Sequence, residues 1–96
     1  MDNVAKAILD NIAVQMKNDP RLQASAVGYI DDGRREKRVK ELGLKRAQAA
    51  VEYLVSKGID ASRITATDGG VSTVGDNKTE PGRQENRRVE IQLGVR

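Results

Sequence analysis

The chain has 96 residues, a formal net charge of +3, and neither cysteine nor histidine. A chain this short supports one hydrophobic core, so we expect a single domain. The lack of cysteine and histidine excludes thiol chemistry, the usual structural zinc sites and imidazole acid/base catalysis by the protein itself. Tyr29 and Tyr53 are the only aromatic residues, so the core must be aliphatic, and platforms for stacking nucleic-acid bases are nearly missing.

An amphipathic helix is predicted at the start of the chain. Its apolar side chains recur every four residues, at Val4, Ile8, Ile12 and Met16. Pro20 stops it, because the residue before a proline disfavours helical backbone. The chain contains no run of about eighteen apolar residues, and its first residues lack the continuous apolar core of a signal peptide.

A strand and a long helix follow. Residues 22–30, LQASAVGYI, alternate weakly and carry small side chains, which predicts a strand packed closely under a helix. Asp32 or Gly33 is the predicted N-cap of a helix over residues 34–57, and Gly58 is its predicted stop. The apolar stripe of this helix is formed by Leu44, Ala47, Val51 and Leu54.

Two further strands complete the predicted domain. A short one lies around Ile64 and Ala66, a polar loop covers residues 69–86, and the last strand alternates through Val89, Ile91 and Leu93. The order α-β-α-β-β predicts an α+β fold with two helices on one face of a small mixed β-sheet, the second helix crossing between parallel strands. The chain has no internal repeat and no linker, so residues 1–96 are expected to form one domain.

Three segments together resemble the OmpA-like C-terminal domain, the module that holds outer-membrane and flagellar-motor proteins to peptidoglycan. They are GYID at 28–31, LGLKRAQAAVEYLVSKGIDASRI at 42–64 and NRRVEIQL at 86–93. The resemblance implies a βαβαββ fold from which the first strand is missing, so the domain is expected to be N-terminally truncated. It would then have an exposed sheet edge that could pair with a second copy.

The resemblance also implies a binding site. In that family an aspartate and the arginine of an Arg-Ala pair clasp the ammonium and carboxylate end of diaminopimelate, and these roles fall on Asp31 and Arg46. Such a zwitterionic end needs one carboxylate and one guanidinium held at a similar separation. Other positions of the same pattern complete the predicted ligand-binding set: Asn86, Arg87, Arg88, Val39 and Leu42. Of the two arginines, Arg88 is expected to be the more exposed.

Three positions depart from the family pattern. Ile30 replaces a threonine, Val39 an asparagine and Gly43 a serine, so two polar contacts are replaced by hydrocarbon. The resemblance implies a non-catalytic module that binds the peptidoglycan stem peptide, is periplasmic, and is associated with the outer membrane only through a region outside this chain. The alternative is a degenerate domain that has kept the fold but lost the ligand and serves as a structural or oligomerising unit.

Simpler interpretations of the same charges remain open. Asp31 is expected to cap a helix if it does not bind a ligand, and Arg46 to pair with Glu41 or Glu52 on its own helix. The basic run 34–46 is typical of a solvated helix face, and binding of nucleic acid is not expected. No motif of fixed spacing supports an enzyme, a metal or a cofactor.

Overall fold

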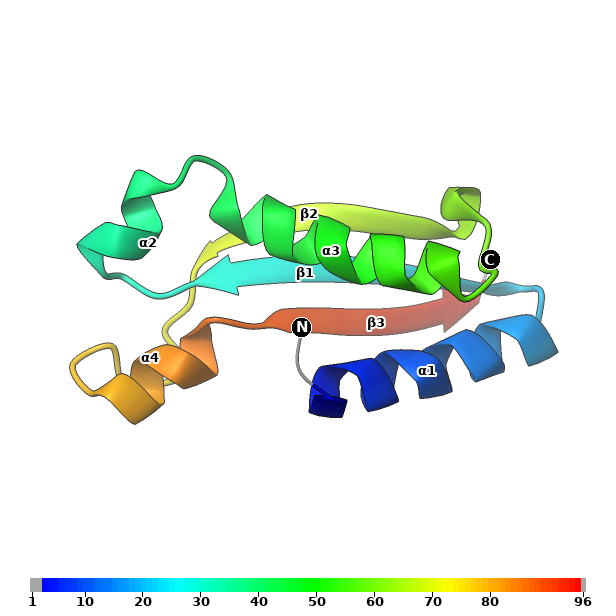
Figure 1. Ribbon diagram of the computed structural model, residues 1–96, viewed down its shortest axis with the longest axis horizontal. Helices are drawn as coiled ribbons and strands as arrows, with labels where there is room; N and C mark the ends of the chain where they lie inside the picture. The colour runs from blue at the N-terminus through cyan, green and yellow to red at the C-terminus, as the bar shows by residue number, and fades with distance from the viewer. Residues whose placement is uncertain (1–2, 96) are drawn as a thin grey trace.

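The computed structural model describes residues 3–95, which form an α+β sandwich with helices on one face of a three-stranded mixed sheet (Figure 1). The predicted fold class is confirmed. Among these residues, no helix is long and apolar enough to cross a membrane. In chain order the elements are α1 (Asn3–Asn18), β1 (Leu22–Ile30), α2 (Arg34–Arg38), α3 (Leu42–Ser56), the 3₁₀ helix η1 (Ala61–Arg63), β2 (Ile64–Val71), α4 (Glu80–Asn86) and β3 (Val89–Val95).

The sheet has the strand order β2-β1-β3, with β1 at its centre. β1 pairs parallel with β2, with Ala24 opposite Ile64, and antiparallel with β3, with Gly28 opposite Val89. The predicted parallel crossover is therefore confirmed. Because β3 runs against β1, the end of β1 lies beside the start of β3, and α2 and α4 gather at this end of the molecule (Figure 1).

The core is small and aliphatic, as the composition predicts. Ala24 and Ala26 of β1 are buried beneath α3, which contributes Ala47, Ala50 and Leu54. Leu9, Ile12 and Met16 of α1 close one side of this core. Small side chains on the strand leave room for α3 to approach the sheet closely, since packed interiors leave few voids.

The closest approach of α3 to the sheet is made by two glycines, Gly28 in β1 and Gly43 in α3. A Cβ atom on Gly28 would overlap the carbonyl oxygen of Gly43, and one on Gly43 would lie 2.6 Å from the carbonyl oxygen of Gly28. The side chain of Asp68 in β2 also crowds Gly43. Glycine is therefore required at both positions by the short distance between the backbones. The serine that the family pattern has in place of Gly43 would not fit here.

The prediction of a single helix over residues 34–57 is wrong, because the structure divides this segment into α2 and α3. Val39 caps the C-terminus of α2, and Glu41 adopts left-handed backbone with φ of 58°. α2 buries no side chain, so no apolar contact holds its axis in line with that of α3. The predicted stop is confirmed: Gly58 has φ of 95°, and the N–H of Ile59 donates to the carbonyl of Leu54.

The loop predicted over residues 69–86 contains more regular structure than expected. β2 continues to Val71, and α4 begins after Thr79, whose Oγ1 accepts a hydrogen bond of 3.1 Å from the N–H of Gly82. Thr79 followed by Pro81 is a pattern typical of a helix start, because a threonine side chain and an early proline both suit the first turn. The polar composition of the segment concealed this short helix.

We predict that Gly43→Ala destabilises the domain by about 1–3 kcal/mol, because the added methyl group must push α3 away from β1. Chemical denaturation measures the loss. The matched control is Gly94→Ala in β3, where a Cβ atom would meet no other group within 4 Å, and we expect a change within about 0.5 kcal/mol. Equal stability of the two variants would contradict the tight contact.

Candidate functional site

The predicted site residues come together where β1 ends and β3 begins. Asp31 follows the last residue of β1, and Arg46 lies in the second turn of α3. Arg87 and Arg88 link α4 to β3. Residues that are far apart in the sequence therefore surround one end of the central strand (Figure 1).

Asp31 is buried, with 2% of its surface exposed. Its Oδ1 accepts a hydrogen bond of 2.8 Å from the N–H of Gly33, and its Oδ2 accepts one of 3.3 Å from Nη1 of Arg87. The first bond fixes the turn that leads into α2, where Gly33 itself is the N-cap. Asp31 therefore accepts a hydrogen bond from the N-cap residue, Gly33, and is not itself the N-cap of the helix.

Arg46 holds two elements together through its guanidinium group. Nη1 donates to the main-chain carbonyl of Tyr29 at 3.0 Å, and Nη1 and Nη2 donate to the two carboxylate oxygens of Glu36 at 2.5 and 3.0 Å. The prediction that Arg46 pairs with Glu41 or Glu52 is wrong: its partner lies on α2. A bidentate arginine–carboxylate pair of this kind is among the stronger polar contacts in proteins.

Glu36 lies between the two halves of the predicted clamp. Only 13% of its side chain is exposed, and its carboxylate accepts both hydrogen bonds of the Arg46 guanidinium. Burial raises the pKa of Glu36, but the hydrogen bonds from Arg46 and from the Asp31 N–H outweigh this effect and leave the pKa below its ordinary value. The carboxylate is therefore ionised at neutral pH and holds α2 against the end of β1.

Arg87 joins this network from the opposite side. It contacts Asp31 and also Glu80 at the start of α4, with Nη2 2.5 Å from Oε1 of Glu80. The hydrogen bond to Glu80 raises the pKa of Arg87, so its charge is fixed. The greater exposure predicted for Arg88 is wrong, since 28% of the Arg87 side chain is exposed and 23% of the Arg88 side chain. Arg87 is also the arginine that contacts Asp31.

Arg88 takes part in a different set of contacts. Its guanidinium carbon lies 4.4 Å from the centre of the Tyr29 ring, and its nitrogens donate to Ser72 and to Glu90. This is a cation–π contact between the start of β3 and the end of β1. Arg88 therefore connects all three strands near the site without touching Asp31.

The remaining predicted residues differ in exposure. Asn86 is completely buried; it accepts from the N–H of Gly75 at 2.7 Å and donates to the carbonyl of Gly75 and to Asn77. It therefore holds the loop before α4 in place. Val39 is 42% exposed at the C-terminus of α2, and Leu42, half-buried, begins α3.

A groove of about 380 Å³ adjoins the site. Its polar lining consists of Arg46, Arg87 and Arg88, and its apolar lining comes from α1 and β3. The apolar residues are Val4, Ala5, Ile8 and Leu9 of α1, Ala50 of α3, and Val89 and Ile91 of β3. The site thus combines guanidinium groups with hydrocarbon walls, a combination suited to a ligand that has both an anionic and an aliphatic part.

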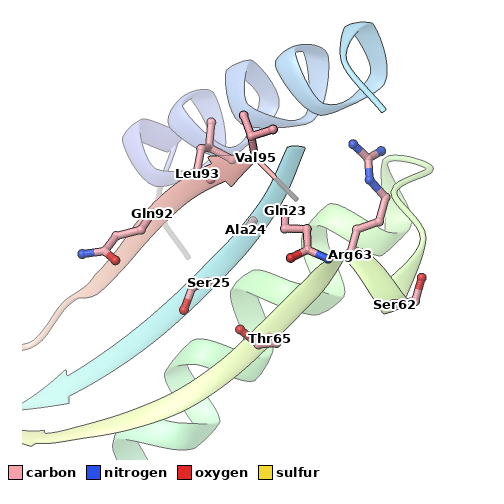
Figure 2. Close-up of a pocket in the computed structure, with 10 residues that line it drawn as sticks. Gln23, Ala24, Ser25, Ser62, Arg63, Thr65, Gln92, Leu93 and Val95 are labelled. Carbon is pink, nitrogen blue, oxygen red and sulfur yellow. The ribbon is translucent and has the colours of Figure 1, made fainter. Parts of the chain in front are cut away.

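A second pocket, of about 280 Å³, lies at the other end of the sheet, beside Gln23, Ser25, Thr65 and Gln92 (Figure 2). Its one charged side chain, Arg63, turns toward the start of β1 and donates to the carbonyls of Met16, Asp19 and Leu22. Those bonds occupy its guanidinium and tie α1, β1 and η1 together. Among residues 3–95, no cluster of acidic side chains could hold a metal ion.

Sequence reasoning missed Glu36 as a member of the site. It is the one acidic residue in α2, and this isolation within a basic run was the available signal. The assumption of one continuous helix concealed its role, because a straight helix would not return residue 36 to residue 46. The break at residues 39–41 makes the contact possible.

We predict that the Arg46–Glu36 pair makes stability depend on pH in the acid range. The folded pKa of Glu36 lies below its ordinary value of 4.5, so its contribution is complete above that value and is lost as pH falls through the folded pKa. Glu36→Gln should therefore flatten the fall of unfolding free energy below about pH 4.5. Urea denaturation across the acid range tests this, with Glu41→Gln as the control. Parallel pH profiles for the wild type and Glu36→Gln would contradict the assignment.

We also predict that Asn86→Ala destabilises the domain by about 1–3 kcal/mol, because the buried N–H and carbonyl of Gly75 lose their partner. Hydrogen exchange at the Gly75 amide should accelerate. Gln84→Ala, an exposed change in the same helix, is the control and should leave exchange at Gly75 unchanged. Unaltered protection of Gly75 in Asn86→Ala would show that the loop does not depend on this side chain.

Comparison with known proteins places this chain in a family. The model of the OmpA family matches residues 1–87. Outer membrane protein A of Bordetella avium is 39% identical over 89 residues, which are 92% of this chain and 46% of that protein. The peptidoglycan-binding protein ArfA of Mycobacterium tuberculosis is 34% identical over 85 residues, which are 88% of this chain and 26% of that protein.

A solved structure agrees with the sequence matches. The peptidoglycan-associated lipoprotein from Burkholderia pseudomallei superposes with a TM-score of 0.86 at 25% identity, over 98% of this chain and 80% of that one. The chain spans less than half the length of the two curated relatives named above. Sequence and fold therefore lead to the same conclusion: the chain belongs to the OmpA family.

Proposed function

We propose that this domain is a non-catalytic binding module that attaches its parent protein to peptidoglycan by gripping the diaminopimelate end of the stem peptide. Asp31 and Arg46 would hold the ammonium and the carboxylate of that end. Relatives that carry peptidoglycan in their names support the polymer as the partner. The same relatives and an outer membrane protein support a periplasmic, outer-membrane-associated location.

The observation that carries the proposal is the position of Glu36. This place already binds a carboxylate, because Arg46 and the N–H of Asp31 converge on the Glu36 side chain. A ligand carboxylate in its place would meet the same two guanidinium nitrogens and would lie near the N–H of Asp31. The ligand ammonium would then lie beside the carboxylate of Asp31 and the carbonyl of Tyr29, which Arg46 already approaches.

Binding requires that Glu36 leaves Arg46. α2 has five residues, contains no apolar side chain, and has no side-chain hydrogen bond at its N-cap. The left-handed Glu41 follows it, so its C-terminal end can rotate with little resistance from packing, while the hydrogen bond from the Gly33 N–H to Asp31 keeps its other end near β1. Each charge-assisted hydrogen bond to the ligand would contribute about 1.5–3 kcal/mol to the binding free energy. The loss of the contact between Glu36 and Arg46 would offset part of this gain.

The adjoining groove would accept the rest of the diaminopimelate side chain. The groove has a volume of about 380 Å³ and is lined by three arginines and by apolar side chains. This lining matches an aliphatic chain that ends in charged groups. Burial of its three methylene groups there would add roughly 0.8 kcal/mol for each one. The groove would therefore extend the clamp with apolar contacts and with the guanidinium groups of Arg87 and Arg88.

The degenerate domain without a ligand remains the second candidate, and one observation favours it. Both charged groups of the clamp are satisfied within the protein, Asp31 by Gly33 and Arg87, and Arg46 by Glu36. Ile30 and Val39 also replace polar residues of the family pattern. In this case the network would serve only to fasten α2 and α4 to the sheet.

Isothermal titration with diaminopimelate, and sedimentation with purified peptidoglycan, separate the two candidates. We expect Arg46→Gln and Asp31→Asn to weaken binding by about 10- to 100-fold or more, since each loses at least one charge-assisted contact. Glu36→Gln should strengthen binding several-fold because it removes the internal competitor. This last variant keeps the test informative if Asp31→Asn fails to fold.

The matched controls are Asp32→Asn and Lys45→Gln, which change exposed neighbours of the same charge and should bind like the wild type. Equal binding by the clamp variants and these controls would contradict the proposal. Absence of binding in both the wild type and Glu36→Gln would favour the domain without a ligand.

A further inference from the structure

A second charged surface lies on the outer side of α2. We define the α2 basic face as five cationic residues within seven positions, all of them exposed: Arg34, Arg35, Lys37, Arg38 and Lys40. The diaminopimelate clamp proposed above does not use them. They are close to it in space, because Glu36 of the same helix contacts Arg46.

The inward position of Glu36 leaves this face without a neutralising charge. Glu36 is the one acid in α2, and its carboxylate is bound by Arg46. Arg34 and Arg38 lie roughly opposite Glu36 around the helix axis, given about 100° per residue. Within residues 3–95, none of the five cations forms an ion pair.

Arginines elsewhere in the described chain are mostly neutralised by neighbours. Arg21 pairs with Asp19, Arg83 with Glu80, and Arg88 with Glu90. Like charges one helical turn apart, such as Arg34 and Arg38, repel and destabilise a helix. The α2 basic face therefore concentrates uncompensated positive charge on a helix that the charge itself weakens, and an anionic partner would relieve this cost.

We propose that the α2 basic face binds carboxylates of a polymeric anionic ligand, namely further carboxylates of the same peptidoglycan peptides that the clamp holds. This inference rests on the proposed function, because the clamp would place the polymer next to α2. A nucleic acid is disfavoured by the lack of free aromatic platforms: Tyr29 lies under Arg88, and the Tyr53 hydroxyl donates to Asp10. The α2 basic face thus attracts the anionic polymer electrostatically over a longer range than the direct contacts of the clamp.

The expected contribution depends strongly on salt. Exposed charges separated by more than about 8–10 Å are largely screened at physiological ionic strength, whereas the nearly buried contacts of Arg46 are screened much less. Attraction by the α2 basic face should therefore be lost at high salt while binding by the clamp persists. This difference allows the two contributions to be measured in one protein.

The experiment compares two double variants of equal charge. Arg34→Gln with Arg38→Gln removes two cations from the α2 basic face, and Lys6→Gln with Lys17→Gln removes two exposed cations of α1. Sedimentation with purified peptidoglycan measures affinity, and fluorescence anisotropy with labelled poly-L-glutamate isolates the carboxylate contact. At low ionic strength the first variant should bind both probes roughly 3- to 10-fold more weakly than the second, and the difference should vanish at high salt.

Two results would overturn the inference. One is equal binding of poly-L-glutamate and peptidoglycan by the two double variants at low salt. The other is binding through this face to phosphatidylglycerol vesicles or to single-stranded DNA without any binding to poly-L-glutamate, which would indicate a phosphate-bearing partner.

Titration with free diaminopimelate separates this inference from the proposed function. The Arg34 and Arg38 double variant should bind free diaminopimelate as the wild type does, because the clamp is intact. If the wild type fails to bind it, the clamp is contradicted. Equal poly-L-glutamate binding by the two double variants contradicts the α2 basic face and leaves the clamp in place.

Discussion

The close contact between Gly28 and Gly43 sets the geometry on which the rest of the structure depends. It allows the backbone of α3 to approach β1 far more closely than residues with a Cβ atom would permit. At this distance Arg46, three residues after Gly43, reaches the carbonyl of Tyr29, the residue after Gly28. The backbone contact therefore determines where the guanidinium of Arg46 lies.

Arginines compensate for the small size of the core. Nearly half of the buried hydrophobic side chains are alanine, and a domain of this size gains limited stability from burial alone. Arg63 joins α1 to β1 through three main-chain carbonyls, and Arg87 joins α4 to the turn after β1. Because arginine has five donors in a planar group, it can satisfy carbonyls and carboxylates from separate elements at once.

The charged groups of the site pair with one another within the protein. Two carboxylates, Asp31 and Glu36, and two guanidinium groups, Arg46 and Arg87, are paired within it. A buried charge without a partner is costly, so this pairing stabilises the arrangement of α2, α3 and α4 around the end of β1. For the clamp proposed above, a ligand would gain only the difference between its own contacts and those of Glu36, so that competition would set its affinity.

The sequence by itself determined the fold class, the parallel crossover, the stop at Gly58 and the family. Hydrophobic periodicity and turn residues are local properties that can be read directly from the sequence. The spacing between Asp31 and Arg46 matches the family pattern and can be read in the same way. The break between α2 and α3 was not predictable from the helical pattern, because it depends on whether α2 finds an apolar surface to cover.

Only the tertiary structure decided the partners of the charged residues. Glu36 meets Arg46 because the chain turns back at residues 39–41, and Arg87 meets Asp31 because β3 pairs antiparallel with β1. Salt bridges act over a few ångströms and depend on which segments the fold brings together, so the sequence pattern does not specify them.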